Sequence, residues 1–356
     1  YATPSTGGCG GRLKAIPEDF IVEEVPAYAP SGCGEHLYLF IEKCGENTVA
    51  VAQILAEICG QPTDAVGFSG RKDVKAITRQ WFSVYRAQDV YLNALEQRGL
   101  RVLKVTRHRN KLRLGHLRGN SFHIVVRGIN PNYNPISIAA WLTQYGFPNY
   151  FGMQRLGVNF SNASRGQDRF FKRRFTRHSG ATARFQESAY QSALFNDLLA
   201  TRLTALGQLE RLLPGDQALL HRNAALFEVD ASILAQTQLR ADNGELSPSL
   251  PLIGKAPPWA KGWQGSLERG LMVRERLEPW CDAPPNLGPP GERRAARAFP
   301  QNLRVKKYRE SGENLLSFQF KLDRGVFATA LMREFMRNDG LSYYGEPWPI
   351  PTICHG

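Results

Sequence analysis

Two strand-like runs joined by a short basic turn, between residues 65 and 85, constrain the fold of this chain most. Apolar residues at 65–68 are typical of the end of one strand, and residues 80–85 alternate between apolar and polar side chains as in a second strand. Asp73 lies in the turn that joins them. The sequence therefore predicts that Asp73 lies at an edge of a β-sheet.

The charges around Asp73 distinguish it from most turn residues. Arg71, Lys72 and Lys75 are its neighbours, and they would hold its carboxylate ionised while attracting a polyanion. An anion within a positive patch weakens the attraction to phosphate, so affinity alone does not explain it. The alternative is a structural turn residue, whose side chain accepts a hydrogen bond from the backbone two residues further on.

The net charge of +13 and the pI near 9.6 indicate an anionic partner. Nucleic acid is the first expectation and an anionic membrane surface the second. No apolar run approaches the roughly 18 residues of a membrane-spanning helix. Residues 1–12 lack the apolar segment of a signal peptide. We therefore expect a globular cytoplasmic protein without a membrane partner.

The cysteines and histidines show no spacing typical of a metal site. The six cysteines contain no C-x-x-C pair and the seven histidines no H-x-x-x-H pair. The phosphate-binding pattern G-x-x-x-x-G-K-[ST] does not occur either. We expect neither a metal nor a nucleotide cofactor.

Helical and strand periodicity is clear towards both ends of the chain. Strands are expected at 20–25, 35–43, 121–127 and 315–322, and helices at 48–58, 135–145, 187–203 and 327–338. Residues 241–291 are rich in proline and glycine and are typical of a loop-rich lobe. The simplest arrangement is a discontinuous α/β core domain, residues 1–175 and 293–356, with an inserted lobe at 176–292.

Basic residues concentrate in two segments. Residues 101–127 hold eight, with no acid, and residues 165–184 hold seven against Asp168 alone. One charge run is usually a solvated face, but two in so basic a chain favour nucleic acid. Aromatic residues among them, such as Phe170 and Phe171, suit unstacked bases. No helix-turn-helix or zinc finger offers a reader of the major groove, so folded RNA is favoured over duplex DNA.

Two further segments complete a candidate site. Lys14 lies just before the predicted strand at 20–25 and could extend over the sheet. The segment FPNYFG at 147–152 is bracketed by a proline and a glycine, which predicts exposed aromatic side chains on a constrained loop. The alternative for this loop is a buried aromatic corner. Asp73, Lys14 and Phe151 together would supply a carboxylate nucleophile, a cation that keeps it ionised and a flat apolar face for a base.

Six motifs resemble, in order and spacing, those of the TruD family of tRNA pseudouridine synthases. They are PEDFIVEE at 17–24, SGRKDVKAITRQWFSV at 69–84, RHRNKLRLGHLRGNSF at 107–122, NYFGMQRLG at 149–157, SAYQSALFN at 188–196 and GVFATALMREF at 325–335. The resemblance implies an isomerase that converts a uridine in tRNA, at position 13 in the bacterial members, to pseudouridine. It also implies an α/β catalytic domain on a mixed, largely antiparallel sheet, with an inserted domain that forms an RNA-binding cleft.

Residue roles follow from the resemblance only where motifs coincide. Asp73 resembles the catalytic aspartate, Lys14 the lysine that pairs with it and Phe20 the phenylalanine of the first motif. Asn149 and Phe151 match the N-Y-F-G loop, where the family has phenylalanine in the place of the tyrosine that other pseudouridine synthases stack on the target base. Asp73 would act as nucleophile or assist a glycal-forming elimination, and the residues do not choose between these routes.

Contacts with the RNA backbone are expected from the basic segments. The candidates are Arg71, Lys72, Lys75, Arg107, Arg109, Lys111, Arg113, Arg155, Lys172, Arg173 and Arg174. One departure from the family pattern is Val74, where bacterial members tend to carry a basic residue.

Two other functions stay open at this stage: a non-catalytic RNA-binding protein and a metal-dependent nuclease. The nuclease would need clustered acids that Asp73 lacks in the sequence around it. A monomer is expected, because no heptad pattern calls for a partner.

Overall fold

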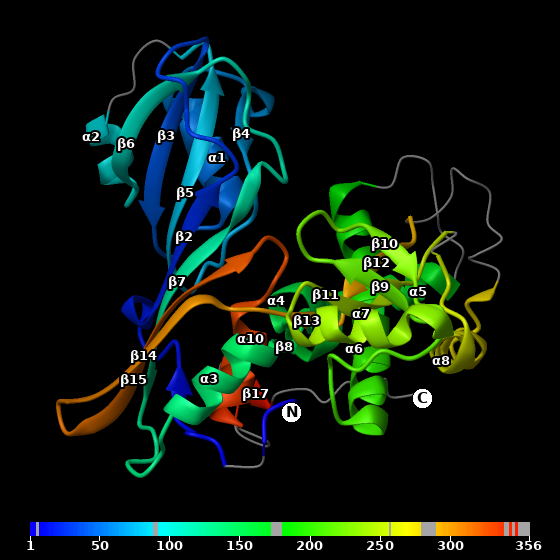
Figure 1. Ribbon diagram of the computed structural model, residues 1–356. Coiled ribbons are helices and arrows are strands. Elements are labelled where there is room, and N and C mark those ends of the chain that lie inside the picture. Colours follow the sequence, from blue (N-terminus) through cyan, green and yellow to red (C-terminus); the bar gives the residue numbers. More distant parts are fainter. Residues whose placement is uncertain are drawn as a thin grey trace.

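A nine-stranded sheet and a lobe beside it make up the computed structural model (Figure 1). The structure describes residues 1–4, 7–87, 92–171, 180–255, 258–278 and 290–337, together with 342–343 and 346–347. None of the helices within these ranges is long and apolar enough to cross a membrane.

The large sheet is mixed and mostly antiparallel, as predicted. Its strands are β1 (Arg12–Leu13), β2 (Phe20–Pro26), β3 (His36–Lys43), β4 (Val66–Phe68), β5 (Ile77–Tyr85), β6 (Arg101–His108), β7 (Leu117–Arg127), β14 (Gln301–Glu310) and β15 (Glu313–Asp323). The order is β14-β15-β7-β2-β5-β3-β6, with β1 added to β7 and β4 to β5. Only β2 and β5 run parallel. The predicted strands at 20–25, 35–43, 121–127 and 315–322 are confirmed.

Helices cover one face of this sheet at both ends. They are α1 (Thr48–Ile58) and α2 (Leu92–Gln97) at the upper end of Figure 1, and α3 (Ile136–Tyr145) and α10 (Ala328–Met336) at the lower end. Alternation along β15 explains this packing, because Phe318 and Phe320 are buried whereas Gln319 and Lys321 are exposed. The Phe318 ring lies 4.8 Å from that of Phe335 in α10.

The opposite face of the upper sheet is covered by the basic loop at residues 109–116. Leu112 of this loop packs in one cluster with Tyr38, Phe40 and Trp81, and its backbone N–H donates to Ser83 Oγ at 2.9 Å. The strand β3 is therefore buried on both sides, since Leu39 and its alternate neighbours pack against α1. This packing holds the basic loop against the sheet at Leu112.

The lobe combines helices with a small sheet. Its elements are α4 (Met153–Leu156), α5 (Ser161–Phe171), α6 (Ala181–Leu206), α7 (Leu234–Asp242), α8 (Gly262–Arg274), β9 (Gln217–Leu220), β10 (Leu226–Glu228), β11 (Leu246–Leu252) and β12 (Glu292–Ala295). The small sheet has the order β10-β9-β11-β12. The short strands β8 (Phe147–Pro148) and β13 (Arg297–Ala298) pair at the junction with the large sheet, and β16 (Ser342–Tyr343) pairs with β17 (Glu346–Pro347).

The expectation of a loop-rich segment at 241–291 is wrong for two elements. Residues 246–252 form β11 despite Pro248 and Pro251, because one half of the strand pairs with β9 and the other with β12. Each half thus needs fewer ladder hydrogen bonds than a strand paired on both sides, which accommodates proline. Residues 262–274 form α8 despite three glycines, and burial of Glu268 and Leu271 compensates for the weak helix propensity. Residues 256–257 and 279–289 lie outside the described ranges.

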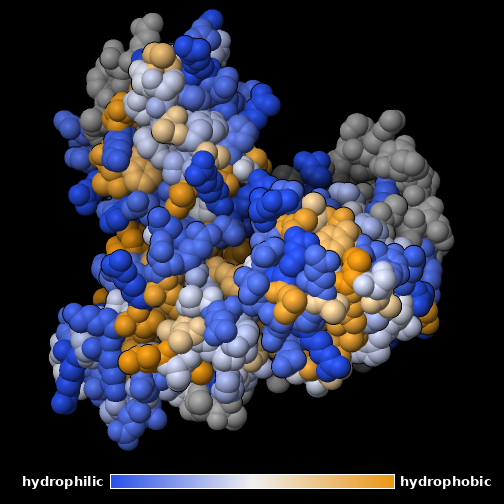
Figure 2. Space-filling model, viewed as in Figure 1, coloured by the Kyte–Doolittle hydropathy of each residue, from blue (hydrophilic) through white to orange (hydrophobic). Residues whose placement is uncertain are grey.

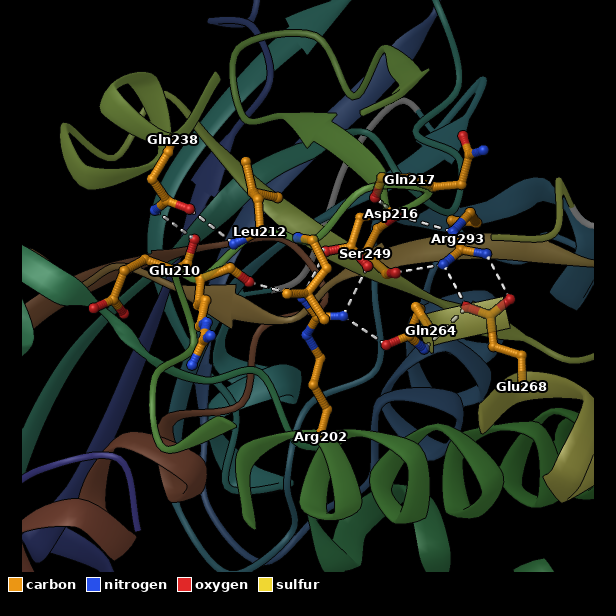
Figure 3. Close-up of polar contacts among 12 residues, drawn as sticks. Arg202, Glu210, Leu212, Asp216, Gln217, Gln238, Ser249, Gln264, Glu268 and Arg293 are labelled. Atoms are coloured by element: carbon orange, nitrogen blue, oxygen red, sulfur yellow. Dashed lines mark hydrogen bonds and ion pairs between the residues drawn. The ribbon is translucent and has the colours of Figure 1, made fainter. Parts of the chain in front are cut away.

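A buried polar network joins the elements of the lobe (Figure 3). Arg202 of α6 donates to both carboxylate oxygens of Asp216, at 2.8 and 2.7 Å, and to Gln264 of α8 at 2.6 Å. Gln264 in turn donates to Glu268 at 3.1 Å, and Glu268 accepts from Arg293 of β12 at 2.7 Å. The network therefore ties β12 to both helices.

Candidate active site

Asp73 lies in the loop between β4 and β5, as predicted, and its carboxylate contacts a lysine, a glutamine and a backbone N–H. Lys14 Nζ forms an ion pair with Oδ2, and Gln154 of α4 donates to the same oxygen at 2.7 Å. The backbone N–H of Lys75 donates to Oδ1 at 3.3 Å. The carboxylate thus links the large sheet to the first helix of the lobe, and 15% of the side chain is exposed.

Lys14 is buried beneath this carboxylate. Its side chain is 1% exposed, and its Nζ lies 4.1 Å from the centre of the Phe20 ring. Its φ of 56° is left-handed, which costs roughly 1–3 kcal/mol for a residue other than glycine. Burial lowers the pKa of Lys14, and the charge of Asp73 opposes this shift. The structure therefore brings Asp73, Lys14 and Phe20 together.

Lys72 does not lie where the sequence led us to expect it. Its side chain is 5% exposed, and its Nζ lies 2.8 Å from Asn120 Oδ1 and 3.5 Å from Glu24 Oε2. Its backbone N–H donates to Thr48 Oγ1 at 2.9 Å. Burial lowers the pKa of Lys72 and raises that of Glu24. Lys72 thus lies away from the surface where a phosphate contact was predicted, and it anchors the loop of Asp73 to β2 and β7.

The loop at 149–151 is buried, so the expectation of exposed aromatic side chains is wrong. Phe151 is 7% exposed, and its backbone N–H and C=O both bond the Asn196 amide at 2.9 Å. Its ring meets those of Phe195 and Phe327 edge to face, with centroids 5.5 and 5.7 Å apart. A Cβ at Gly152 would lie 2.7 Å from Thr329 Oγ1, which explains the glycine of this motif. The buried aromatic corner is the arrangement found.

Arg294 of β12 is a site residue that the sequence did not reveal. Its Cζ lies 4.1 Å from the centre of the Phe151 ring, and its Nε donates to the Asn149 carbonyl at 3.1 Å. Its Nη2 donates to Asn149 Oδ1 and to the Gly325 carbonyl. Asn149 also donates to the Ala295 carbonyl at 3.1 Å. The only signal for Arg294 is the pair of adjacent arginines in ERRAAR, which lies 145 residues from the loop that it contacts.

The other predicted RNA contacts differ in exposure. Arg71, Lys75, Arg109 and Arg113 are exposed, whereas Arg107, Lys111 and Arg155 are half-buried. Arg107 donates to the Ala87 carbonyl at 3.0 Å, and Arg155 contacts Ser188 Oγ and lies 5.2 Å from the Phe185 ring centre. Lys172, Arg173 and Arg174 lie outside the described residues.

The basic loop at 109–116 and the loop of Asp73 lie side by side. The backbone N–H of Gly115 donates to the Ser69 carbonyl at 2.8 Å, four residues before Asp73. A notch separates the upper sheet from the lobe in Figure 2. Exposed cations such as Arg71 and Lys75 therefore lie next to the Asp73 carboxylate at the junction of the two parts, an arrangement that can hold a polyanion and present a nucleophile to it.

Comparison with known proteins identifies the family of this chain. The family model of tRNA pseudouridine synthase D (TruD) matches residues 1–165 and 183–335. A tRNA pseudouridine synthase D of Thermus thermophilus is 38% identical over 362 residues, covering 100% of this chain and 97% of the relative. One from Anaeromyxobacter dehalogenans is 39% identical over 345 residues, covering 95% and 96%.

A solved structure shares the fold. The crystal structure of the putative tRNA pseudouridine synthase D (TruD) from Methanosarcina mazei superposes with a TM-score of 0.71 at 22% identity, and the match covers 95% of each chain. This similarity concerns the fold, whereas the family model and the curated relatives identify the family. The chain belongs to the TruD family of tRNA pseudouridine synthases, which are isomerases.

Proposed function

We propose that this protein converts the uridine at position 13 of tRNA to pseudouridine, with Asp73 as the catalytic residue. The observation that carries the proposal is the ion pair of Asp73 with the buried Lys14, at the junction of sheet and lobe. A cation fixed under the carboxylate favours the ionised form, which is the form that reacts. Family membership supplies the class of substrate.

The reaction exchanges one bond for another within the same nucleotide. The bond between C1′ and N1 of the uridine breaks, the detached uracil turns, and C5 bonds to C1′. The C5 proton leaves and N1 gains a proton, so the product is an isomer. In one route Asp73 attacks C1′ as N1 leaves, and C5 then displaces the carboxylate from C1′. In the other, Asp73 assists removal of the C2′ proton, which gives a glycal, and a proton returns to C2′ when C5 bonds to C1′. A primary isotope effect from deuterium at C2′ is expected only in the glycal route.

The target uridine must leave its stack to reach Asp73. Flipping a nucleotide costs a few kcal/mol, which stacking in the site and phosphate contacts offset. The exposed Arg71 and Lys75 flank Asp73 in its loop and support this role, and the exposed Arg109 and Arg113 lie further along the basic loop at 109–116. We propose that the inserted domain, residues 176–292, forms the second wall of the RNA-binding cleft.

One experiment tests the proposal directly. Purified protein is incubated with tRNA that carries uridine at position 13, and pseudouridine is mapped by carbodiimide treatment and primer extension. We expect one new stop at position 13, and none in tRNA with cytidine there. Product at another position would reject the substrate site, and product formed by Asp73→Asn would reject the role of the aspartate.

A second candidate function rests on the hydrogen bond from the Lys75 N–H to Asp73 Oδ1, which is the contact of a structural turn residue. A protein that only binds RNA would show salt-sensitive affinity for tRNA and no pseudouridine. The same mapping experiment separates the two functions.

A further inference from the structure

The ring of Phe151 is not the surface that an entering base would meet. The residue is 7% exposed, with Phe195 and Phe327 against its edges. Arg294, which is half-buried, covers one face of the ring at 4.1 Å. On this side the guanidinium is the outer layer and the aromatic ring the inner one.

We infer that the flipped uracil stacks on the guanidinium plane of Arg294, with the Phe151 ring behind it. This inference rests on the proposed function, because it concerns the same uridine. Guanidinium planes stack on unpaired bases as aromatic rings do. Arg294 would therefore contact the base directly, in the place expected for Phe151. The assignment explains why a buried phenylalanine can still support a base.

The hydrogen bonds of Arg294 fix its plane and leave its faces available. Its Nε donates to the Asn149 carbonyl at 3.1 Å, and its Nη2 donates to Asn149 Oδ1 and, at 2.8 Å, to the Gly325 carbonyl. Guanidinium N–H groups lie in the plane of the group, so these bonds occupy its rim. The guanidinium packs on Phe151, with the Phe195 ring centre 5.7 Å from its Cζ, and the side chain is only half-buried, so part of it stays exposed to a ligand.

The strand that carries Arg294 is itself held firmly. Neighbouring residues of a strand point to opposite sides, and Arg293 points into the buried network of the lobe (Figure 3). It donates to Glu268 Oε1 at 2.7 Å and to Ser249 Oγ at 2.9 Å. Leu250 of β11 pairs with Arg294 in the sheet. The backbone of Arg294 is therefore set by the lobe, and its side chain by the aromatic loop.

The charge of Arg294 adds a chemical role that phenylalanine cannot supply. When the bond between C1′ and N1 breaks, negative charge develops on the departing uracil. A cation stacked on that ring stabilises the charge as it forms. Burial, with a smaller contribution from the nearby Arg155, lowers the pKa of Arg294 to about 9, so the guanidinium stays protonated at neutral pH. The planar shape and the charge of Arg294 would thus both assist breakage of the bond between C1′ and N1.

Two substitutions separate plane from charge. Arg294→Lys keeps the charge without the plane, and Arg294→Gln removes the charge. We expect the single-turnover rate of pseudouridine formation to fall about tenfold or more in Arg294→Lys and further in Arg294→Gln, from the strength of base stacking. The Kd for tRNA should stay within about threefold, because phosphate contacts dominate it. Arg304→Gln, at an exposed arginine of β14, is the matched control and should leave the rate unchanged.

Three outcomes would overturn the inference. The first is a wild-type rate in both variants, and the second is a faster reaction in Arg294→Gln, which would make Arg294 a placeholder that the base displaces. The third is a loss explained entirely by a smaller folded fraction, measured by thermal unfolding. Wild-type protein and Asp73→Asn are assayed alongside. If the wild type forms no pseudouridine, the proposed function fails; if it does and the Arg294 variants match it, only this inference fails.

Discussion

Two ion pairs of this molecule each join a buried cation to an aspartate, and they differ in access. In the lobe, Arg202 and Asp216 are 2% and 1% exposed, and Asp216 also accepts from the Leu213 N–H at 2.8 Å. In the junction, Lys14 is 1% exposed but Asp73 is 15% exposed. The pair in the lobe is closed to solvent and ligand, whereas solvent or a ligand can reach the Asp73 carboxylate of the junction pair.

The difference separates stability from chemistry. Removing one partner of a closed pair leaves an uncompensated buried charge, which is strongly destabilising. Removing the charge of Asp73 also takes an anion from the buried Lys14, but Lys14 gives up its proton more readily without that anion, so the main loss is the chemistry. We therefore expect the two aspartates to respond oppositely in assays of activity and of unfolding.

The largest effect is expected for Asp73→Asn in the assay of activity. An amide neither attacks C1′ nor takes a proton, so the single-turnover rate should fall on the order of a thousandfold or more, as when a nucleophile is removed. The Kd for tRNA should change by no more than about threefold, since phosphate contacts remain. Rapid-quench kinetics and filter binding measure the two quantities. A rate within tenfold of wild type would place the chemistry elsewhere.

The second effect is expected for Asp216→Asn in the assay of unfolding. Arg202 would lose its charged partner in a closed site, and the free energy of unfolding should fall by about 3–5 kcal/mol. Urea titration measures it, and activity per folded molecule should be retained. Glu245→Gln is the control, because Glu245 pairs with Arg240 in an exposed site, where a pair contributes less than about 1 kcal/mol. Equal losses in the two variants would contradict the distinction.

The third effect concerns pH and sharpens the role of Lys14. Burial lowers the pKa of its ammonium, so the charge beside Asp73 is lost at a lower pH than the charge of an exposed lysine. The rate should therefore decline on the alkaline side of the pH profile. Arg294 also loses charge near its pKa of about 9, so an alkaline decline alone does not identify Lys14. The test is therefore a comparison of the pH profiles of the wild type and Lys14→Arg. In Lys14→Arg the alkaline decline should move upward, since the ordinary pKa of a guanidinium is higher than that of an ammonium. Identical pH profiles would exclude Lys14 as the cause.

The smallest effect is expected for Gln154→Ala. The amide donates to Asp73 Oδ2 at 2.7 Å from the exposed surface of α4. Its loss removes one hydrogen bond to a charged acceptor, and the rate should fall about fivefold. Gln154→Glu places a second negative charge at the same contact, which would raise the pKa of Asp73. The loss of rate at acidic pH should then begin at a higher pH than in the wild type. An unchanged acidic limb would show that the contact is absent in solution.

Local patterns predicted most elements of the large sheet. Alternation identified β3 and β15, and helical periodicity identified α1, where the Asn47 side chain accepts from the Ala50 N–H at 2.9 Å. The strand β11 was missed because its tertiary pairing outweighs the local preference of two prolines. Propensity reports on neighbours in sequence, and β11 is held by residues far from it.

The site was predictable in its residues and less so in their surroundings. Resemblance to the family pointed to Asp73 and Lys14, which lie 59 residues apart and do form an ion pair. The burial of Phe151 depends on Asn196, and that of Lys72 on Glu24 and Asn120. These contacts join distant segments, so no local pattern encodes them. Exposure is the property that the sequence described least well.

The most direct measurement of the central claim follows the hydrogen at C5. Transfer RNA labelled with tritium at C5 of its uridines is mixed with excess protein, and the tritium released to water is counted over a single turnover. We predict release from one uridine per tRNA with the wild-type protein and none with Asp73→Asn, while both bind the tRNA. Release by Asp73→Asn at the wild-type rate, or no release by the wild type, would contradict the account.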